Sequence, residues 1–87
     1  WDKKWRIIFF DIPESQKSNR DAFAGKVRQM GFVVLQRSVF VHPFPCRHEV
    51  ETVANYFGVS DYISYVEAND IDNQKALIKR FSNLLTL

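Results

Sequence analysis

Residues 32–44, FVVLQRSVFVHPF, decide the fold of this chain. The stretch is too apolar and too rich in β-branched residues for a loop, yet the polar residues Gln36–Ser38 interrupt it in the middle. Pro43 closes it, because proline cannot donate to a strand ladder. We therefore expect two strands in succession, Phe32–Leu35 and Val39–His42, joined by a tight turn or bent at a bulge.

Strands and helices alternate on both sides of this pair. Apolar residues recur every three or four positions where we expect helices, and short β-rich runs bounded by proline or glycine indicate strands. The remaining expected elements are a strand over Trp5–Asp11, a helix over Glu14–Gly31, a helix over Cys46–Gly58, a strand over Asp61–Glu67 and a helix over 72–87.

The order β-α-β-β-α-β-α predicts an α+β fold of the ferredoxin-like βαββαβ class, in which two helices cover one face of an antiparallel sheet. An extra C-terminal helix follows the six common elements. Residues 1–87 are expected to form this single domain. Because the chain starts at Trp1 rather than Met, we expect it to be a segment cut from a longer protein.

Local signals mark where the helices begin and end. We expect Ser15 or Ser18 to cap the first helix and Asp72 to cap the last, while Gly31 lies just past the end of the first. Gly25 lies inside the first helix, where glycine costs about 1 kcal/mol relative to alanine. We expect its missing side chain to permit close packing on the sheet.

The first strand is apolar on both faces, with Ile7 and Phe9 on one side and Ile8 and Phe10 on the other. A strand of this kind is buried on both faces. Two helices can cover only one face of a sheet this small, so the second face needs the final helix or a second copy of the chain. We expect a homodimer, because two-fold pairing of a self-complementary surface is the commonest arrangement.

Composition excludes several classes of protein. The formal net charge is only +2, which is not the charge of a dedicated nucleic-acid coat. A single cysteine cannot form an internal disulfide, so we expect a cytoplasmic protein. The longest apolar runs fall far short of the ~18 residues of a membrane span, so no membrane partner is expected.

Asp11 is the candidate catalytic residue and metal ligand, since it stands where the first strand stops. If a two-fold axis passes near this point, two copies of Asp11 would share a Mg²⁺ ion, which would activate water against a phosphodiester. Mg²⁺ is the only cofactor expected. The alternative is a turn acid that caps backbone N–H groups two residues on, and residue types alone favour that alternative.

Basic residues are the candidate contacts to DNA or RNA. They gather at the N-terminus, on the first helix and at the junction of the paired strands, and a doubled basic stripe on a dimer would track a phosphate backbone. The alternative is a solvated face, which we favour for Lys17, Lys26 and Arg28. The candidate nucleic-acid contacts are Lys3, Lys4, Arg6, Arg20, Arg37 and Ser38.

His42, Cys46 and His48 lie close together in the sequence and raise the question of zinc. A structural zinc site needs four ligands, and this spacing matches no established pattern. We interpret the segment as a proline-braced turn in which Cys46 is a small apolar plug.

The motif IIFFDIPE, an arginine on the first helix and the segment GFVVLQRSVFV together resemble the small dimeric CRISPR-associated family that forms the second core component of spacer acquisition. This resemblance implies a ferredoxin-like homodimer. It also implies either a metal-dependent endonuclease that uses the strand-one aspartate, or a non-catalytic adapter that bridges an integrase and holds duplex DNA. The matching residues are Asp11, Ile12, Pro13, Arg20, Gly31, Gln36, Ser38, Val39 and Phe40.

The flanks resemble a second family more closely. WDKKWRIIFFDIPE together with VHPFPC is similar to the core domain of the phenylacetic-acid-catabolism repressors, in which a winged-helix DNA-binding domain precedes a domain of this same fold. That resemblance implies a dimerisation core linked covalently to winged helices, without catalysis.

Two departures from the CRISPR-associated pattern weaken the nuclease interpretation. This chain ends in an amphipathic helix where that family often has a strand that reaches across to the partner, and Val41 and His42 stand where many members carry an acid. We expect first a nucleic-acid-binding homodimer of the CRISPR-associated type, acting as an adapter or weak endonuclease. The dimerisation core of a transcription repressor is the alternative, and an interaction domain that touches no nucleic acid is the third hypothesis. Whether the chain is an enzyme stays open.

Overall fold

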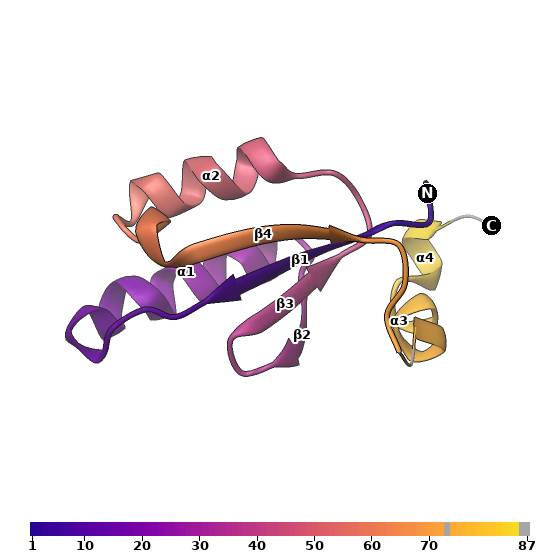
Figure 1. Cartoon of the computed structure of the whole chain (residues 1–87), viewed down its shortest axis with the longest axis horizontal. Helices are drawn as coiled ribbons and strands as arrows, with labels where there is room; N and C mark the ends of the chain where they lie inside the picture. The colour runs from indigo at the N-terminus through magenta and orange to yellow at the C-terminus, as the bar shows by residue number, and fades with distance from the viewer. Residues whose placement is uncertain (73, 86–87) are drawn as a thin grey trace.

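The computed structural model describes residues 1–72 and 74–85. Its strands form one sheet, which has the order β2-β3-β1-β4 and is antiparallel at every pairing. The elements in chain order are β1 (Trp5–Phe10), the 3₁₀ turn η1 (Glu14–Gln16), α1 (Lys17–Gln29), β2 (Val33–Gln36), β3 (Val39–His42), α2 (Arg47–Tyr56), the 3₁₀ turn η2 (Ser60–Tyr62), β4 (Ile63–Ala68), α3 (Gln74–Arg80) and α4 (Ser82–Leu85) (Figure 1).

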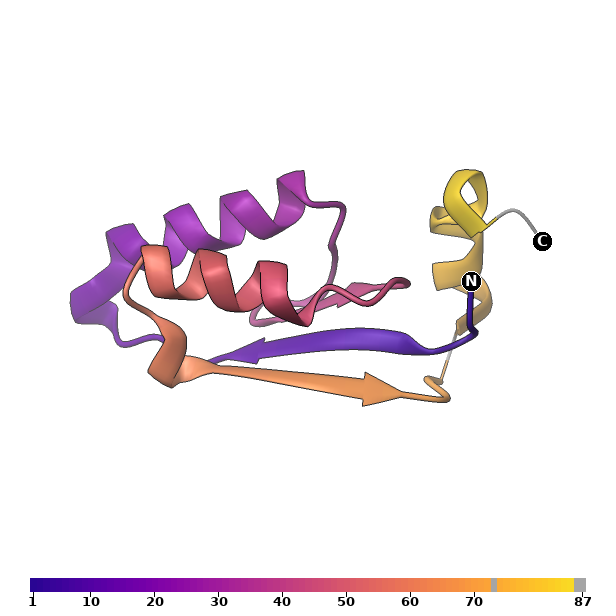
Figure 2. The ribbon, with the colours of Figure 1, turned by 90° about the horizontal axis from the view of Figure 1, so that it is seen from above.

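This arrangement confirms the predicted fold class. Strand β1 lies between β3 and β4, so each of the two βαβ units is split by a strand of the other. Helices α1 and α2 pack side by side on one face of the sheet, as Figure 2 shows. None of the described helices is long and apolar enough to cross a membrane.

The paired strands contain both a tight turn and a bulge. Val34 is opposite Phe40, but Gln36 is opposite Val39, so Leu35 is an extra residue in β2. The chain then turns at residues 37–38. β2 starts and ends one residue later than the predicted strand Phe32–Leu35.

The first core lies between the sheet and helices α1 and α2. It contains the side chains of β1 and β3 that point toward the helices, and these meet the buried stripes of both helices. Its largest fully buried members are Phe23, Phe40, Ile8, Val27, Val50 and Val59.

A second core lies on the opposite face of the sheet, so β1 is buried on both sides at Ile7 and Ile8, but the predicted burial of Phe9 is wrong for a single copy of the chain. Trp5, Ile7 and Val41 pack there against Leu77, Phe81 and Leu85 of the C-terminal region. Figures 1 and 2 show α3 and α4 at one end of the sheet, beside the N-terminus. The final helices therefore cover only part of this face.

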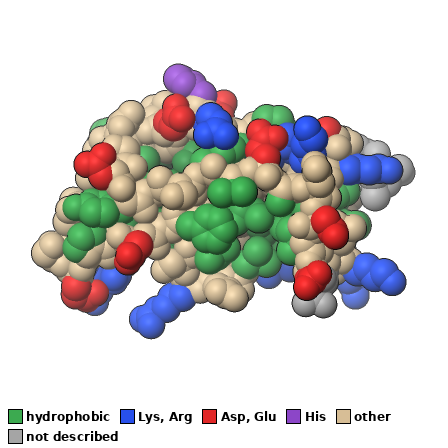
Figure 3. All heavy atoms as spheres, viewed as in Figure 1, with side chains coloured by type: hydrophobic (Ala, Val, Ile, Leu, Met, Phe, Trp, Pro, Cys, Tyr) green, Lys and Arg blue, Asp and Glu red, His purple; other side chains and the backbone are tan. Residues whose placement is uncertain are grey.

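The rest of that face carries exposed apolar side chains. Phe9 is 43% exposed and Val66 is 38% exposed, and Val39, which is half-buried against the second core, lies beside Phe9 in the sheet. Figure 3 shows hydrophobic side chains gathered over the middle of the sheet, next to α3 and α4. We call Phe9, Val39 and Val66 the open patch.

Several local predictions differ from the structure or concern residues outside the described ranges. The N-cap of α1 is Gln16, not a serine, because the 3₁₀ turn after Pro13 delays the helix. Gly25 is exposed and an added Cβ would meet nothing within 4 Å, so the expected close packing there is wrong. The predicted single final helix is instead two short helices, α3 and α4, separated by a turn at Phe81. Its predicted cap, Asp72, adjoins residue 73, which lies outside the described residues, as do residues 86–87.

Candidate functional site

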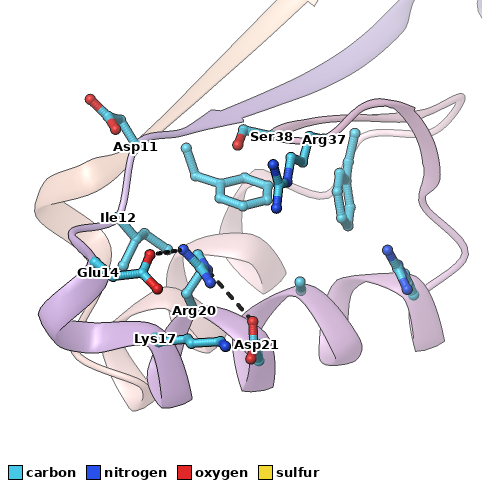
Figure 4. A pocket seen from close by; sticks show the side chains of 12 residues that line it. Asp11, Ile12, Glu14, Lys17, Arg20, Asp21, Arg37 and Ser38 are labelled. Carbon is cyan, nitrogen blue, oxygen red and sulfur yellow. Dashed lines mark hydrogen bonds and ion pairs between the residues drawn. The ribbon is translucent and has the colours of Figure 1, made fainter.

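A cleft of about 600 Å³ opens between α1 and the turn that joins β2 to β3. It brings together four of the predicted site residues, Asp11, Arg20, Arg37 and Ser38, which are far apart in the sequence (Figure 4). Lys17 and Arg28, for which we favour a solvated face from the sequence, also line the cleft.

One side of α1 forms one wall of the cleft. Residues three, four, seven and eleven positions apart lie on one side of a helix, and Lys17, Arg20, Asp21, Ala24 and Arg28 have this spacing. This spacing was the sequence signal for the cleft. Only the fold shows that this side faces the strand junction.

The turn between β2 and β3 forms the other wall. The Phe10 backbone N–H donates to the Ser38 carbonyl over 3.1 Å, which holds residues 37–38 beside the end of β1. Arg37 and Ser38 are both exposed there. The turn therefore presents a cation and a hydroxyl group to the cleft.

Arg20 is held by two acidic side chains. Its Nη1 donates to Glu14 Oε2 over 3.1 Å, and its Nε lies 3.5 Å from Asp21 Oδ1 (Figure 4). The side chain is 27% exposed, so the ion pairs are partly shielded from water. Much of the positive charge of Arg20 is compensated within the protein.

Asp11 is exposed and lines the edge of the cleft. Figure 4 shows its carboxylate pointing away from Arg20 and Arg37. Its backbone N–H donates to the Tyr62 carbonyl over 3.1 Å, while the carboxylate has no hydrogen bond or ion pair with any described residue. The turn-acid alternative fails because the residue two positions on is Pro13, which has no N–H to be capped.

The carboxylate of Asp11 does not make a metal site by itself. Among residues 1–72 and 74–85, no group of three His, Cys, Asp or Glu side chains is placed to hold a metal ion. Mg²⁺ typically binds through one or two carboxylates completed by waters and substrate phosphates. A Mg²⁺ ion shared between two copies of Asp11 stays a prediction about a dimer.

The N-terminal basic residues lie at the opposite end of β1 from this cleft. Arg6 is only 2% exposed, and its guanidinium donates to both carboxylate oxygens of Asp2 over 2.9 and 2.6 Å and to the Pro43 carbonyl over 2.9 Å. The pair holds the pKa of Asp2 well below its usual range and raises the pKa of Arg6. The side chain of Arg6 is therefore buried and its charge is paired with Asp2, whereas Lys3 and Lys4 are exposed.

The WDKKWR segment forms a hook that closes the second core. Asp2 accepts from the Lys4 backbone N–H over 3.0 Å, and Lys3 adopts a φ of 63° where the chain turns. The ring of Trp1 packs on Trp5 with centroids 4.8 Å apart. Trp5 in turn donates through Nε1 to the Gln74 side chain over 3.2 Å. The segment thus joins β1 to α3.

His42 and Cys46 are buried residues whose contacts lie inside the protein. Nδ1 of His42 accepts from the Phe44 N–H over 3.1 Å, so Nε2 carries the proton and donates to the Met30 carbonyl, also over 3.1 Å. Burial lowers the pKa of His42 and raises the pKa of the Cys46 thiol. Cys46 belongs to the first core, which confirms its interpretation as an apolar plug.

Gly31 fits the same arrangement. Its φ of 100° lies in the region that favours glycine, and an added Cβ would come within 3.2 Å of His42 Nε2. The glycine therefore ends α1 and makes room for the histidine that binds the end of the helix.

Comparison with known proteins supports one of the two resemblances. No curated protein matches the chain. A family model described as the central Cas2-like domain of PaaX protein matches residues 1–78, which include the WDKKWR hook, the whole sheet and the start of α3. Membership of the CRISPR-associated family itself is not confirmed. Because the match spans most of the sequence, the chain belongs to the family of PaaX central Cas2-like domains.

Proposed function

We propose that this domain is the self-association core of a PaaX-type transcription regulator and that it has no catalytic activity. Two copies pair through the open patch and thereby hold their linked winged-helix domains at a defined separation. Membership of the PaaX family supports the regulator setting. The incompletely covered face of the sheet supports self-association.

The open patch is the observation that carries this proposal. Phe9 lies on the inner strand β1, opposite Val39 on β3, and Val66 on β4 lies diagonally across from it, two residues beyond its direct partner Ser64. Side chains of this kind are normally buried, and burial contributes about 25 cal/mol for each Å² of apolar surface removed from water. The final helices leave this surface exposed, so a second copy gains by covering it.

The geometry suits an isologous contact. A two-fold axis through the open patch would place the Phe9 side chain of each copy against the patch of the other, so one surface serves both partners. The patch is also continuous with the second core, since Ile7 is opposite Val66 in the sheet. Self-association would extend an existing core across the interface.

Light scattering on three proteins tests the proposal. Wild type is expected to be a dimer at tens of micromolar, and Phe9→Glu a monomer, because a charge would be buried in the interface. Tyr56→Glu is the matched control, since Tyr56 is an 82% exposed aromatic residue of α2, far from the patch. A monomeric wild type, or a Phe9→Glu protein that stays dimeric, would refute the proposal.

A further inference from the structure

We infer that the cleft between α1 and the β2–β3 turn binds the sugar-phosphate backbone of duplex nucleic acid without reading its sequence. The cleft lies within one copy of the chain, so this inference does not depend on self-association. It concerns a surface separate from the open patch and from any winged-helix domain.

Three of the four basic side chains in the cleft keep their charge available. Within the described ranges, the ion pairs of basic residues involve only Arg6 and Arg20. Lys17, Arg28 and Arg37 therefore carry the positive charge that a ligand meets. Arg28 lies over the ring of Phe40, 5.6 Å from its centroid, a contact that positions the guanidinium without neutralising it.

The spacing of these charges favours an extended anion over a small one. Lys17 and Arg28 are eleven residues apart on α1, which corresponds to about 16 Å along a helix that rises 1.5 Å per residue. A small phosphate compound would need cations that converge on one point. A DNA strand places one phosphate every ~3.4 Å along its axis, so this length matches about five consecutive phosphates.

The cleft lacks the features that recognise bases. Its aromatic residues are Phe10 and Phe40, which are 6% and 1% exposed and cannot stack on a base. Besides its carboxylates, it presents four cations and the hydroxyl group of Ser38, which are groups that bind phosphate oxygens. These observations favour a duplex, whose bases are already stacked, over a single strand.

The acidic residues of the cleft set a limit on its affinity. Glu14 and Asp21 compensate Arg20, Asp11 also lines the cleft, and all three carboxylates would repel a phosphate backbone at close range. The site is therefore suited to weak contacts that assist a stronger DNA-binding element. Removing an acid should strengthen binding, and this sign distinguishes a backbone site from an ordinary solvated face.

The first test is fluorescence anisotropy of the 87-residue chain with a labelled duplex of arbitrary sequence, between about 50 and about 200 mM salt. Each phosphate contact makes the slope of log affinity against log salt more negative by ~0.9, so loss of one contact lowers affinity about eightfold near 0.1 M salt. Lys17→Gln and Arg37→Gln should each show this loss. Lys79→Gln, which removes an exposed charge on α3, is the control and should stay close to wild type.

The second test removes a negative charge from the cleft, so the expected change in affinity has the opposite sign. Asp21→Asn should bind the duplex several-fold more tightly, whereas Asp70→Asn, in a loop outside the cleft, should not. The inference is overturned if wild type does not bind the duplex, or if Lys79→Gln weakens binding as much as Arg37→Gln. It is also overturned if inorganic phosphate at matched ionic strength displaces the duplex, or if a single strand of equal length binds more tightly.

Discussion

Removal of the Phe81 side chain tests whether the final helices are an integral part of the domain. Phe81 is 4% exposed and packs against Trp5, with ring centroids 6.0 Å apart, and against His42 at 6.3 Å. Replacing a buried phenylalanine by alanine typically costs ~3–5 kcal/mol. We expect the lower end, about 3 kcal/mol, because α4 is a short helix that can settle into part of the space.

That loss is large for a domain of this size. The total stability expected for 87 residues is roughly 4–13 kcal/mol. A loss of about 3 kcal/mol corresponds to a fall of roughly 12–24 °C in Tm. Phe81→Ala should therefore leave a folded but clearly weakened protein.

Guanidinium unfolding provides the assay. Tryptophan fluorescence reports on Trp1 and Trp5, which both contact the second core, while far-UV circular dichroism reports on all the helices and strands. The two transitions should coincide in wild type if the cores unfold together. Leu84→Ala is the control, since Leu84 lies on α4 but is 52% exposed and should change stability by less than about 0.5 kcal/mol. Equal effects of the two substitutions, or a cost of Phe81→Ala below about 1 kcal/mol, would show that α3 and α4 do not seal the second core.

Three further predictions follow from the local geometry. Burial lowers the pKa of His42, so just below its ordinary value of 6.5 the unfolded chain binds more protons than the folded protein, and stability should fall as pH decreases through that window. Urea midpoints measured from about pH 5 to about pH 8 should show this dependence in wild type and in His48→Asn, but lose it in His42→Gln. Gly31→Ala should destabilise the protein by about 1–2 kcal/mol through the strained φ and the His42 contact, whereas Gly25→Ala should stabilise it by up to about 1 kcal/mol; thermal melts that give both the same sign would contradict this account. Purified domain with Mg²⁺ or Mn²⁺ should not cleave labelled RNA or DNA through Asp11, and cleavage by wild type that is absent in Asp11→Asn would show that the domain is a nuclease.

Much of the fold could be predicted from the sequence because its signals are local. The alternation of strands and helices, the split βαβ order and the position of Gly31 just past the end of α1 all follow from periodicity and turn chemistry within short windows. Burial of Ile7 and Ile8 on opposite faces of β1 was also predictable, since they alternate across the strand, whereas Phe9 is exposed against that prediction. These features depend on each residue and its neighbours along the chain.

Which residues belong to the site depends on contacts between segments that are distant in the sequence. Arg6 was indistinguishable from the exposed Lys4 in sequence, but the hook that folds Asp2 back onto it removes its charge from the surface. Lys17 and Arg28 resembled an ordinary solvated face until the β2–β3 turn placed Arg37 opposite them. Periodicity shows that a side chain is buried or exposed, whereas the partner that buries it or shares its charge is chosen only when the elements pack.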